Sequence, residues 1–209
     1  EGLSGGILFS GDIGKEVQAI CGGWGETKER DYPKDLPIKA LWIESTNFDR
    51  ESVNFNEKYE QFLGSINKIL KDGGSVVIPA ISMQRNQEIV EIIRYAQENG
   101  DIPKNTKIYK DAPLASKFEE TYVEDADLFM TSRFGNDPEF YKNSLSSKSR
   151  FELNNCQLVA NNKESVEISR SLLANNQNSI VITSGGMLGH GRVRNYIDRD
   201  FGTNPKNGI

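Results

Sequence analysis

The hydrophobic pattern of this chain changes repeatedly between short continuous apolar runs and longer helical stripes. The runs at 39–44 and 75–79 are typical of strands buried on both faces, because they show no polar alternation. Other runs predict strands at 6–9, 106–109, 157–160 and 179–183. Apolar residues at three- and four-residue steps predict helices at 54–71, 84–97, 113–123, 163–174 and 192–198.

The order of these elements predicts the fold class. Strand and helix alternate about five times from residue 39 onward, which indicates right-handed crossovers between parallel strands. We therefore expect an α/β fold, doubly wound, with a mostly parallel sheet and helices on both faces. The segment 15–38 carries glycines and prolines without a period and is expected to be a connecting loop, and a short helix is expected to begin near Asp137.

Polar residues follow the predicted strands. Five strands end in small, polar or acidic residues, beginning at Glu44, Pro79, Asp111, Asn161 and Ser184. Because ligands of open α/β sheets bind beyond the carboxyl ends of the strands, we expect these strand ends to form one binding edge. For Glu44 alone, the alternative is an ordinary solvated acid at the end of a strand.

The last strand end carries the clearest binding signal. The sequence SGGMLGHGR follows it and places glycines at 185, 186, 189 and 191, whose backbone N–H groups would allow a phosphate to approach. The structural alternative is that the glycines only permit a tight turn. Arg192 and Arg194, with Arg85 and Lys117 near the other strand ends, would give this edge a local positive charge.

Composition limits the class of protein. The 209 residues are 36% hydrophobic and carry a net charge of −5, so no global basic field attracts nucleic acid. The two cysteines are far apart and suggest neither a disulfide framework nor a zinc knuckle, which favours a reducing, cytoplasmic setting. No apolar run approaches the ~20 residues of a membrane span, so no membrane association is expected.

Five sequence blocks in a fixed order resemble the β-CASP family of metallo-β-lactamase-fold nucleases, which includes RNase J and the cleavage and polyadenylation endonuclease. The blocks are FSGDIG at 9–14, IESTNFDR at 43–50, GGSVVIPAISMQRNQEIVEII at 73–93, DAPLASKFEETY at 111–122 and SIVITSGGMLGHGRV at 179–193. The resemblance implies a zinc-dependent enzyme that hydrolyses RNA phosphodiesters, with an α/β β-CASP domain inserted into a metallo-β-lactamase domain.

The resemblance also implies roles for individual residues. Asp12 matches the acid that bridges two zinc ions in the family, and Glu44 matches an acid that orients an active-site histidine. Ser184, Gly185 and Gly186 match a loop that faces single-stranded RNA, so this loop, Arg192, Arg194, Lys117 and Arg85 are the expected RNA-binding residues.

The residue inventory limits the chemistry expected of this chain. A catalytic zinc needs three protein ligands, mostly histidine, and the only histidine is His190, among glycines. We therefore expect no zinc and no activity in this chain alone, and we interpret it as part of a longer enzyme, with the rest of the metallo-β-lactamase domain as its partner. The expected parts are 1–38, the strand–turn end of the first metallo-β-lactamase half and a linker; 39–200, the β-CASP domain; and 201–209, the start of the return.

An alternative from another class is a non-catalytic, doubly wound nucleotide-binding module, because the same alternation and glycines would serve it. The block around Asp12 favours the nuclease, since a self-contained binding domain has no need of a strand and acidic turn ahead of a linker.

Overall fold

A computed structural model describes residues 5–13, 37–51, 55–124, 149–175, 178–198 and 200–209. The expected loop at 15–38 and the expected helix near Asp137 lie almost entirely outside these residues. The strands are β1 Gly6–Phe9, β2 Ile38–Trp42, β3 Val76–Ala80, β4 Lys107–Asp111, β5 Cys156–Leu158 and β6 Ser179–Ser184. The helices are α1 Phe55–Lys71, α2 Arg85–Asn99, α3 Pro113–Glu124, α6 Asn162–Asn175 and α7 Arg194–Ile197, with 3-10 turns at Ser149–Phe151 and Asp200–Thr203.

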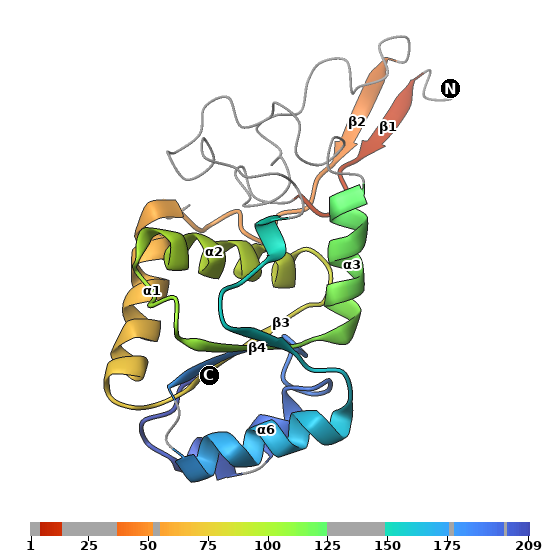
Figure 1. The fold of residues 1–209 in the computed structure, drawn as a ribbon. Helices are drawn as coiled ribbons and strands as arrows, with labels where there is room; N and C mark the ends of the chain where they lie inside the picture. Colours follow the sequence, from red (N-terminus) through yellow and green to blue (C-terminus); the bar gives the residue numbers. More distant parts are fainter. Residues whose placement is uncertain (1–4, 14–36, 52–54, 125–148, 176–177, 199) are drawn as a thin grey trace.

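The central sheet has four strands in the order β3-β6-β4-β5, and every neighbouring pair is parallel. The chain moves from β3 to β4 and on to β5, and then returns through α6 to β6, which lies between β3 and β4. Figure 1 shows α1, α2 and α3 on one side of this sheet and α6 on the other. The predicted doubly wound α/β fold is therefore confirmed.

Two apolar clusters cover the two faces of the sheet, because neighbouring side chains of a strand point to opposite faces. Val77, Tyr109 and Val181 face the cluster that includes α6 and α7. Their neighbours in sequence face the cluster formed with α1 and α2, namely Val76, Ile78, Ile108, Ile180 and Ile182. Burial on both faces explains the continuous apolar runs that these strands show in the sequence.

Contrary to our expectation, the strand predicted at 39–44 does not lie in the central sheet. It forms β2, which pairs in parallel with β1 as a separate two-stranded sheet and does not join the four central strands. All five residues of β2 are exposed, so the expectation of burial on both faces was wrong. Figure 1 shows the β1–β2 pair apart from the central sheet. An apolar run gives no information about which strand it will pair with, and a pair of strands has no covering layer of its own.

The pairing of β1 with β2 crosses the predicted domain boundary at residue 38, and the boundaries themselves stay a prediction. Near the other end of the described chain, Gly208 lies beside β3: its carbonyl accepts a hydrogen bond from the Val77 N–H, and its N–H donates to the carbonyl of Ser75, just before the strand. Within the part of the chain that the structure describes, no helix is both long and apolar enough to cross a membrane.

Candidate functional site

Most of the predicted binding residues lie at the carboxyl edge of the central sheet. Ala80 at the end of β3 is in register with Ser184 at the end of β6, and Asp111 at the end of β4 is in register with Thr183. α2 begins with Arg85 after β3, and α3 carries Lys117 after β4. The structure therefore brings Ser184 and Arg192 into contact, and the helices that carry Arg85, Lys117 and Arg194 begin beyond the same edge.

The glycine loop after β6 is closed at its base by Ser184. The Ser184 carbonyl accepts a hydrogen bond from the Val193 N–H at 3.0 Å, and its hydroxyl accepts one from the Arg192 N–H at 3.3 Å. Gly185 has φ of +105°, and a side chain there would place Cβ 2.2 Å from the His190 carbonyl oxygen. The turn needs glycine at this position for steric reasons, as the structural alternative proposed.

Gly186 allows a second close approach, between the loop and the end of β3. A Cβ at this position would lie 3.0 Å from the Ile81 nitrogen and 3.2 Å from the Ala80 carbonyl carbon. The loop is thus packed on the backbone of the neighbouring strand end. Met187, Leu188, Gly189 and His190 beyond it are exposed, so the outer part of the loop faces solvent.

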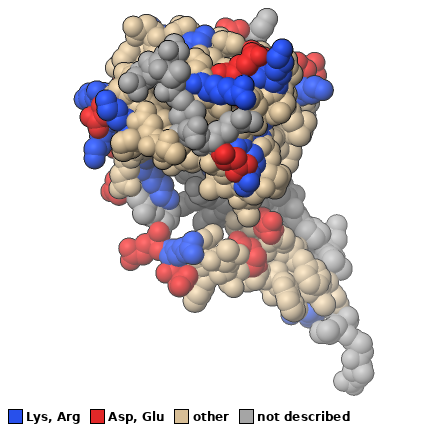
Figure 2. Space-filling view, turned by 90° about the horizontal axis from the view of Figure 1, so that it is seen from below, with Lys and Arg blue, Asp and Glu red and all other residues tan. Residues whose placement is uncertain are grey.

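The positive charge of this edge is weaker than the sequence indicated, because each arginine has an acidic neighbour. Arg85 pairs with Glu88, and Arg194 pairs with Asp198 at 2.5 Å. Arg192 lies near Asp111, as described below. Figure 2 likewise shows Lys and Arg side chains interspersed with Asp and Glu on the face that it draws. In the part of the chain that the structure describes, Lys117 is an exposed cation with no ion pair.

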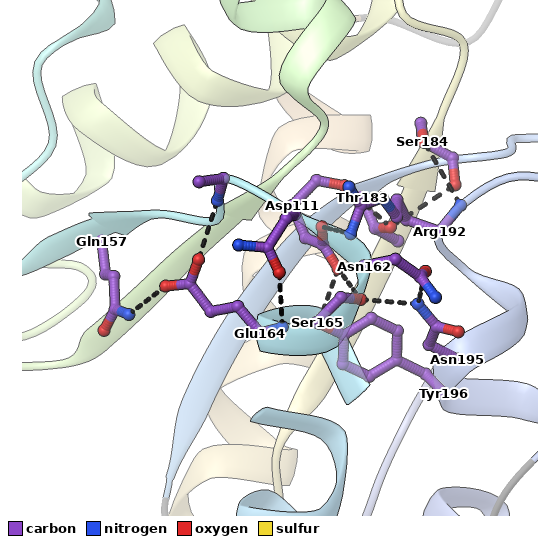
Figure 3. A network of polar contacts seen from close by, with 12 residues as sticks. Asp111, Gln157, Asn162, Glu164, Ser165, Thr183, Ser184, Arg192, Asn195 and Tyr196 are labelled. Atoms are coloured by element: carbon purple, nitrogen blue, oxygen red, sulfur yellow. Dashed lines mark hydrogen bonds and ion pairs between the residues drawn. The ribbon is translucent and has the colours of Figure 1, made fainter. Parts of the chain in front are cut away.

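A buried polar network lies directly behind the loop (Figure 3). Its centre is Asp111, whose side chain is fully buried. Oδ2 of Asp111 accepts hydrogen bonds from the Ser165 hydroxyl and, at 3.0 Å, from the Tyr196 hydroxyl. Oδ1 lies 3.7 Å from Nη1 of Arg192. Burial raises the pKa of the Asp111 carboxyl, whereas the two hydroxyl donors and the Arg192 charge act in the opposite direction.

The sequence identified Asp111 as a strand end but not as the centre of a network. Ser165 lies in α6 and Tyr196 in α7, and no spacing in the sequence connects them with Asp111. Asn195 extends the network, because its amide donates to the Ser165 hydroxyl at 2.8 Å and to the Asn162 side-chain oxygen at 2.8 Å. These contacts depend on the packing of α6 against α7, which only the folded chain shows.

The strand end after β5 forms the start of α6. The Asn161 side chain accepts a hydrogen bond from the Glu164 N–H at 3.0 Å, and Glu164 in turn accepts the Ala160 N–H at 2.8 Å. Glu164 also accepts from the Gln157 side chain at 2.8 Å. This reciprocal arrangement is a variant of the capping box, and it fixes the helix that carries Ser165.

The two acids assigned by resemblance lie together at the ends of β1 and β2. The Glu44 N–H donates to the Ser10 hydroxyl at 3.1 Å, and Asp12 follows Ser10 in the exposed turn. The Thr46 N–H donates to the Glu44 carboxylate at 2.8 Å, and this backbone hydrogen bond lowers the pKa of Glu44. The expected single edge of five strand ends is therefore wrong, since Glu44 belongs to the separate sheet.

Asp12 and Glu44 do not by themselves fit a site for two zinc ions. Among the residues that the structure describes, no group of three or more His, Cys, Asp or Glu side chains could hold a metal. His190 is exposed in the outer part of the glycine loop. Zinc prefers three or four close ligands, so the described residues supply no metal centre.

The fold and the edge residues define a doubly wound α/β domain with a glycine loop and arginines at the carboxyl ends of its strands. A model of the Beta-Casp domain matches residues 86–209, more than half of the chain, so the chain belongs to the β-CASP family. This confirms the family that the five sequence blocks indicated, and it favours the nuclease prediction over a self-contained nucleotide-binding module.

Three relatives match nearly the whole chain. Ribonuclease TTHA0252 of Thermus thermophilus is 24% identical over 97% of this chain and 42% of its own length. Probable RNase MJ4 of Methanocaldococcus jannaschii is 27% identical over 97% of this chain and 41% of its own length. Transcription termination factor FttA of Cenarchaeum symbiosum is 26% identical over 91% of this chain and 27% of its own length. The chain thus spans about two fifths or less of these relatives.

Proposed function

We propose that this chain is the RNA-binding part of a zinc-dependent ribonuclease that hydrolyses RNA phosphodiesters. The observation that supports the proposal most strongly is the match to the β-CASP family, together with two relatives named as ribonucleases that align with 97% of the chain. The longer enzyme would supply the histidine ligands and the remaining metallo-β-lactamase domain, because the described residues hold no metal cluster.

The geometry supports a division of roles between the two sheets. The loop Ser184–Gly186 and the cations Arg192, Arg194, Lys117 and Arg85 would contact the phosphates of single-stranded RNA at the central sheet. Asp12 would bind metal in the longer enzyme, where two zinc ions would supply a Lewis acid and a metal-bound nucleophile. Glu44, whose carboxylate is already oriented by the Thr46 N–H, would position a histidine from outside this chain.

The proposal predicts weak, salt-dependent binding of single-stranded RNA by this chain. Few cations are available and several are paired, so the slope of log affinity against log salt should be small, between about −1 and −3. Replacing both Arg192 and Arg194 with Ala should lower the affinity and reduce the slope by about 1.4, since each of the two lost phosphate contacts removes about 0.7. Fluorescence anisotropy of a labelled RNA at several salt concentrations measures both quantities.

The matched control changes two cations at the opposite, amino-terminal edge of the sheet. Lys68 and Lys71 end α1, just before the amino ends of the strands, so replacing both with Ala changes the net charge equally but should leave the slope unchanged. Glu44→Gln should also leave RNA binding intact, because Glu44 is assigned to cleavage by the longer enzyme. Tight binding of a free nucleotide, with no response to RNA, would contradict the proposal.

A further inference from the structure

The carboxylate of Asp111 is held in a fixed orientation inside the protein. The side chain is fully buried, and two hydroxyl groups from different helices donate to the same oxygen, Oδ2. Burying a charged carboxylate is unfavourable unless donors and a counter-charge surround it. The donors Ser165 and Tyr196 therefore determine the direction of the second oxygen, Oδ1.

That second oxygen faces the guanidinium of Arg192. Oδ1 and Nη1 are 3.7 Å apart, and neither atom has a hydrogen-bond partner among the residues that the structure describes. At this distance the two groups attract each other electrostatically without a short hydrogen bond. The Arg192 side chain is 19% exposed, so a part of the side chain reaches the surface beside the loop, while Nη1 itself is buried. Arg192 is thus held by a buried carboxylate at Nη1 and is partly exposed elsewhere along its side chain.

The same aspartate also contacts the base of the glycine loop through the backbone. The Thr183 hydroxyl donates to the Asp111 carbonyl at 3.2 Å, one residue before Ser184. Ser184 then binds the Arg192 N–H with its hydroxyl and the Val193 N–H with its carbonyl. Asp111, at the end of β4, therefore contacts both ends of the loop: Thr183 just before the loop begins and Arg192 near its end.

We propose that Asp111 is a positioning residue for RNA binding, which orients Arg192 and holds the glycine loop against the end of β4. This inference rests on the proposed function for its RNA readout, but not for its structural readout. Asp111 itself is buried and touches no RNA. It acts through Arg192, whose planar guanidinium has to be oriented to bind a phosphate with two parallel hydrogen bonds.

The direction in which Asp111→Asn changes the RNA affinity distinguishes a positioning role from a simple electrostatic role. Removing a negative charge beside Arg192 would by itself make the edge more positive and strengthen RNA binding. A positioning role predicts weaker RNA binding, because the uncharged amide NH₂ group in the place of Oδ1 would no longer attract the guanidinium. We expect Asp111→Asn to weaken RNA binding about as much as Arg192→Ala, by about tenfold at low salt, which corresponds to one lost charge-assisted hydrogen bond. The salt slope should fall by about 0.7.

A double-mutant cycle tests whether Asp111 acts through Arg192. Asp111→Asn should have little further effect on RNA affinity in a protein that already carries Arg192→Ala, since the group that it positions is gone. Tyr196→Phe removes only one hydroxyl donor and should weaken binding in the same direction but less. Glu119→Gln is the matched control, because Glu119 is another buried acid. It lies in α3 and pairs with Lys110 of β4, not with a residue of the loop.

A structural readout decides the inference independently of RNA. In two-dimensional NMR spectra, Asp111→Asn should shift the backbone amides of Gly185, Gly186 and Gly191, whereas Glu119→Gln should leave them in place. Unchanged loop amides, or tighter RNA binding by a folded Asp111→Asn protein, would overturn the positioning role. If the unmodified protein binds no RNA, the proposed function fails instead, and the loop amides still decide whether Asp111 positions the loop.

Discussion

At the scale of single residues, Ser184 joins the two ends of the glycine loop, because its hydroxyl accepts a hydrogen bond from the Arg192 N–H. Ser184 and Arg192 could be placed because a glycine loop after an apolar strand has a recognisable local pattern. Two of the acids that pair with the arginines also follow a local pattern, because Glu88 and Asp198 lie three and four residues after their partners, but the prediction did not use this spacing. Asp111, in contrast, meets Arg192 only because β4 pairs with β6, the strand that precedes the glycine loop, and a contact between such distant segments leaves no local signal in the sequence.

Gly185 provides the sharpest residue-scale prediction for the loop. An alanine there would combine a positive φ with a Cβ 2.2 Å from the His190 carbonyl oxygen, so the free energy of unfolding should fall by about 2 kcal/mol or more. Gly189→Ala is the control, because the nearest atom to its Cβ would lie 3.9 Å away. Chemical denaturation of both variants measures the difference. Equal stability of the two would show that the loop adopts another backbone conformation.

At the scale of elements, local pattern predicted helices well and strand pairing poorly. The bounds of α1 and α6 agree with the apolar stripes to within a residue, because the helical period and the end signals are both local. β2 was predicted as a buried central strand and is instead an exposed partner of β1. Leu41 and Trp42 belong to the apolar run on which the prediction of burial rested, and they are 58% and 71% exposed. The length of a run says nothing about its partner.

The cap of α6 predicts a pH effect on stability. Hydrogen bonds from the Ala160 N–H and the Gln157 amide lower the pKa of Glu164. A carboxylate with a lowered pKa in the folded state stabilises the protein above its unfolded pKa, about 4.3, and this contribution is lost as the pH falls through the folded value. The unmodified protein should therefore lose more stability on acidification than Glu164→Gln, measured by urea denaturation at a series of pH values.

The control for this pH effect lies on the same helix. Glu167 is an exposed acid whose carboxylate lies 4.0 Å from the Lys163 ammonium, on the surface of α6 rather than at its cap. Glu167→Gln should keep the acid-side loss of stability that Glu164→Gln removes, because an exposed pair of this kind contributes little. A parallel change in both variants would assign the effect to the overall charge of α6 instead of the cap.

At the scale of the whole molecule, alternation predicted the layers but not the strand order. Parallel strands and helices on both faces follow from the connection rules, and the structure shows both. The position of β6 between β3 and β4 does not follow, because it depends on which long-range pairing buries Val181 and Thr183 best. The separation of Asp12 and Glu44 from the central edge was equally unpredictable, since it depends on where β2 finds its partner.

That separation leads to a prediction about zinc. Asp12 lies in an exposed turn beside Glu44, the chain has one histidine, and His190 lies in a loop of the other sheet. Tight zinc binding requires at least three converging ligands, so the 209-residue chain should hold no stoichiometric zinc. Elemental analysis after exhaustive desalting measures this directly, and an Asp12→Asn protein should give the same result. A content of about one zinc ion per chain, lost in Asp12→Asn, would show that Asp12 completes a metal site within these residues.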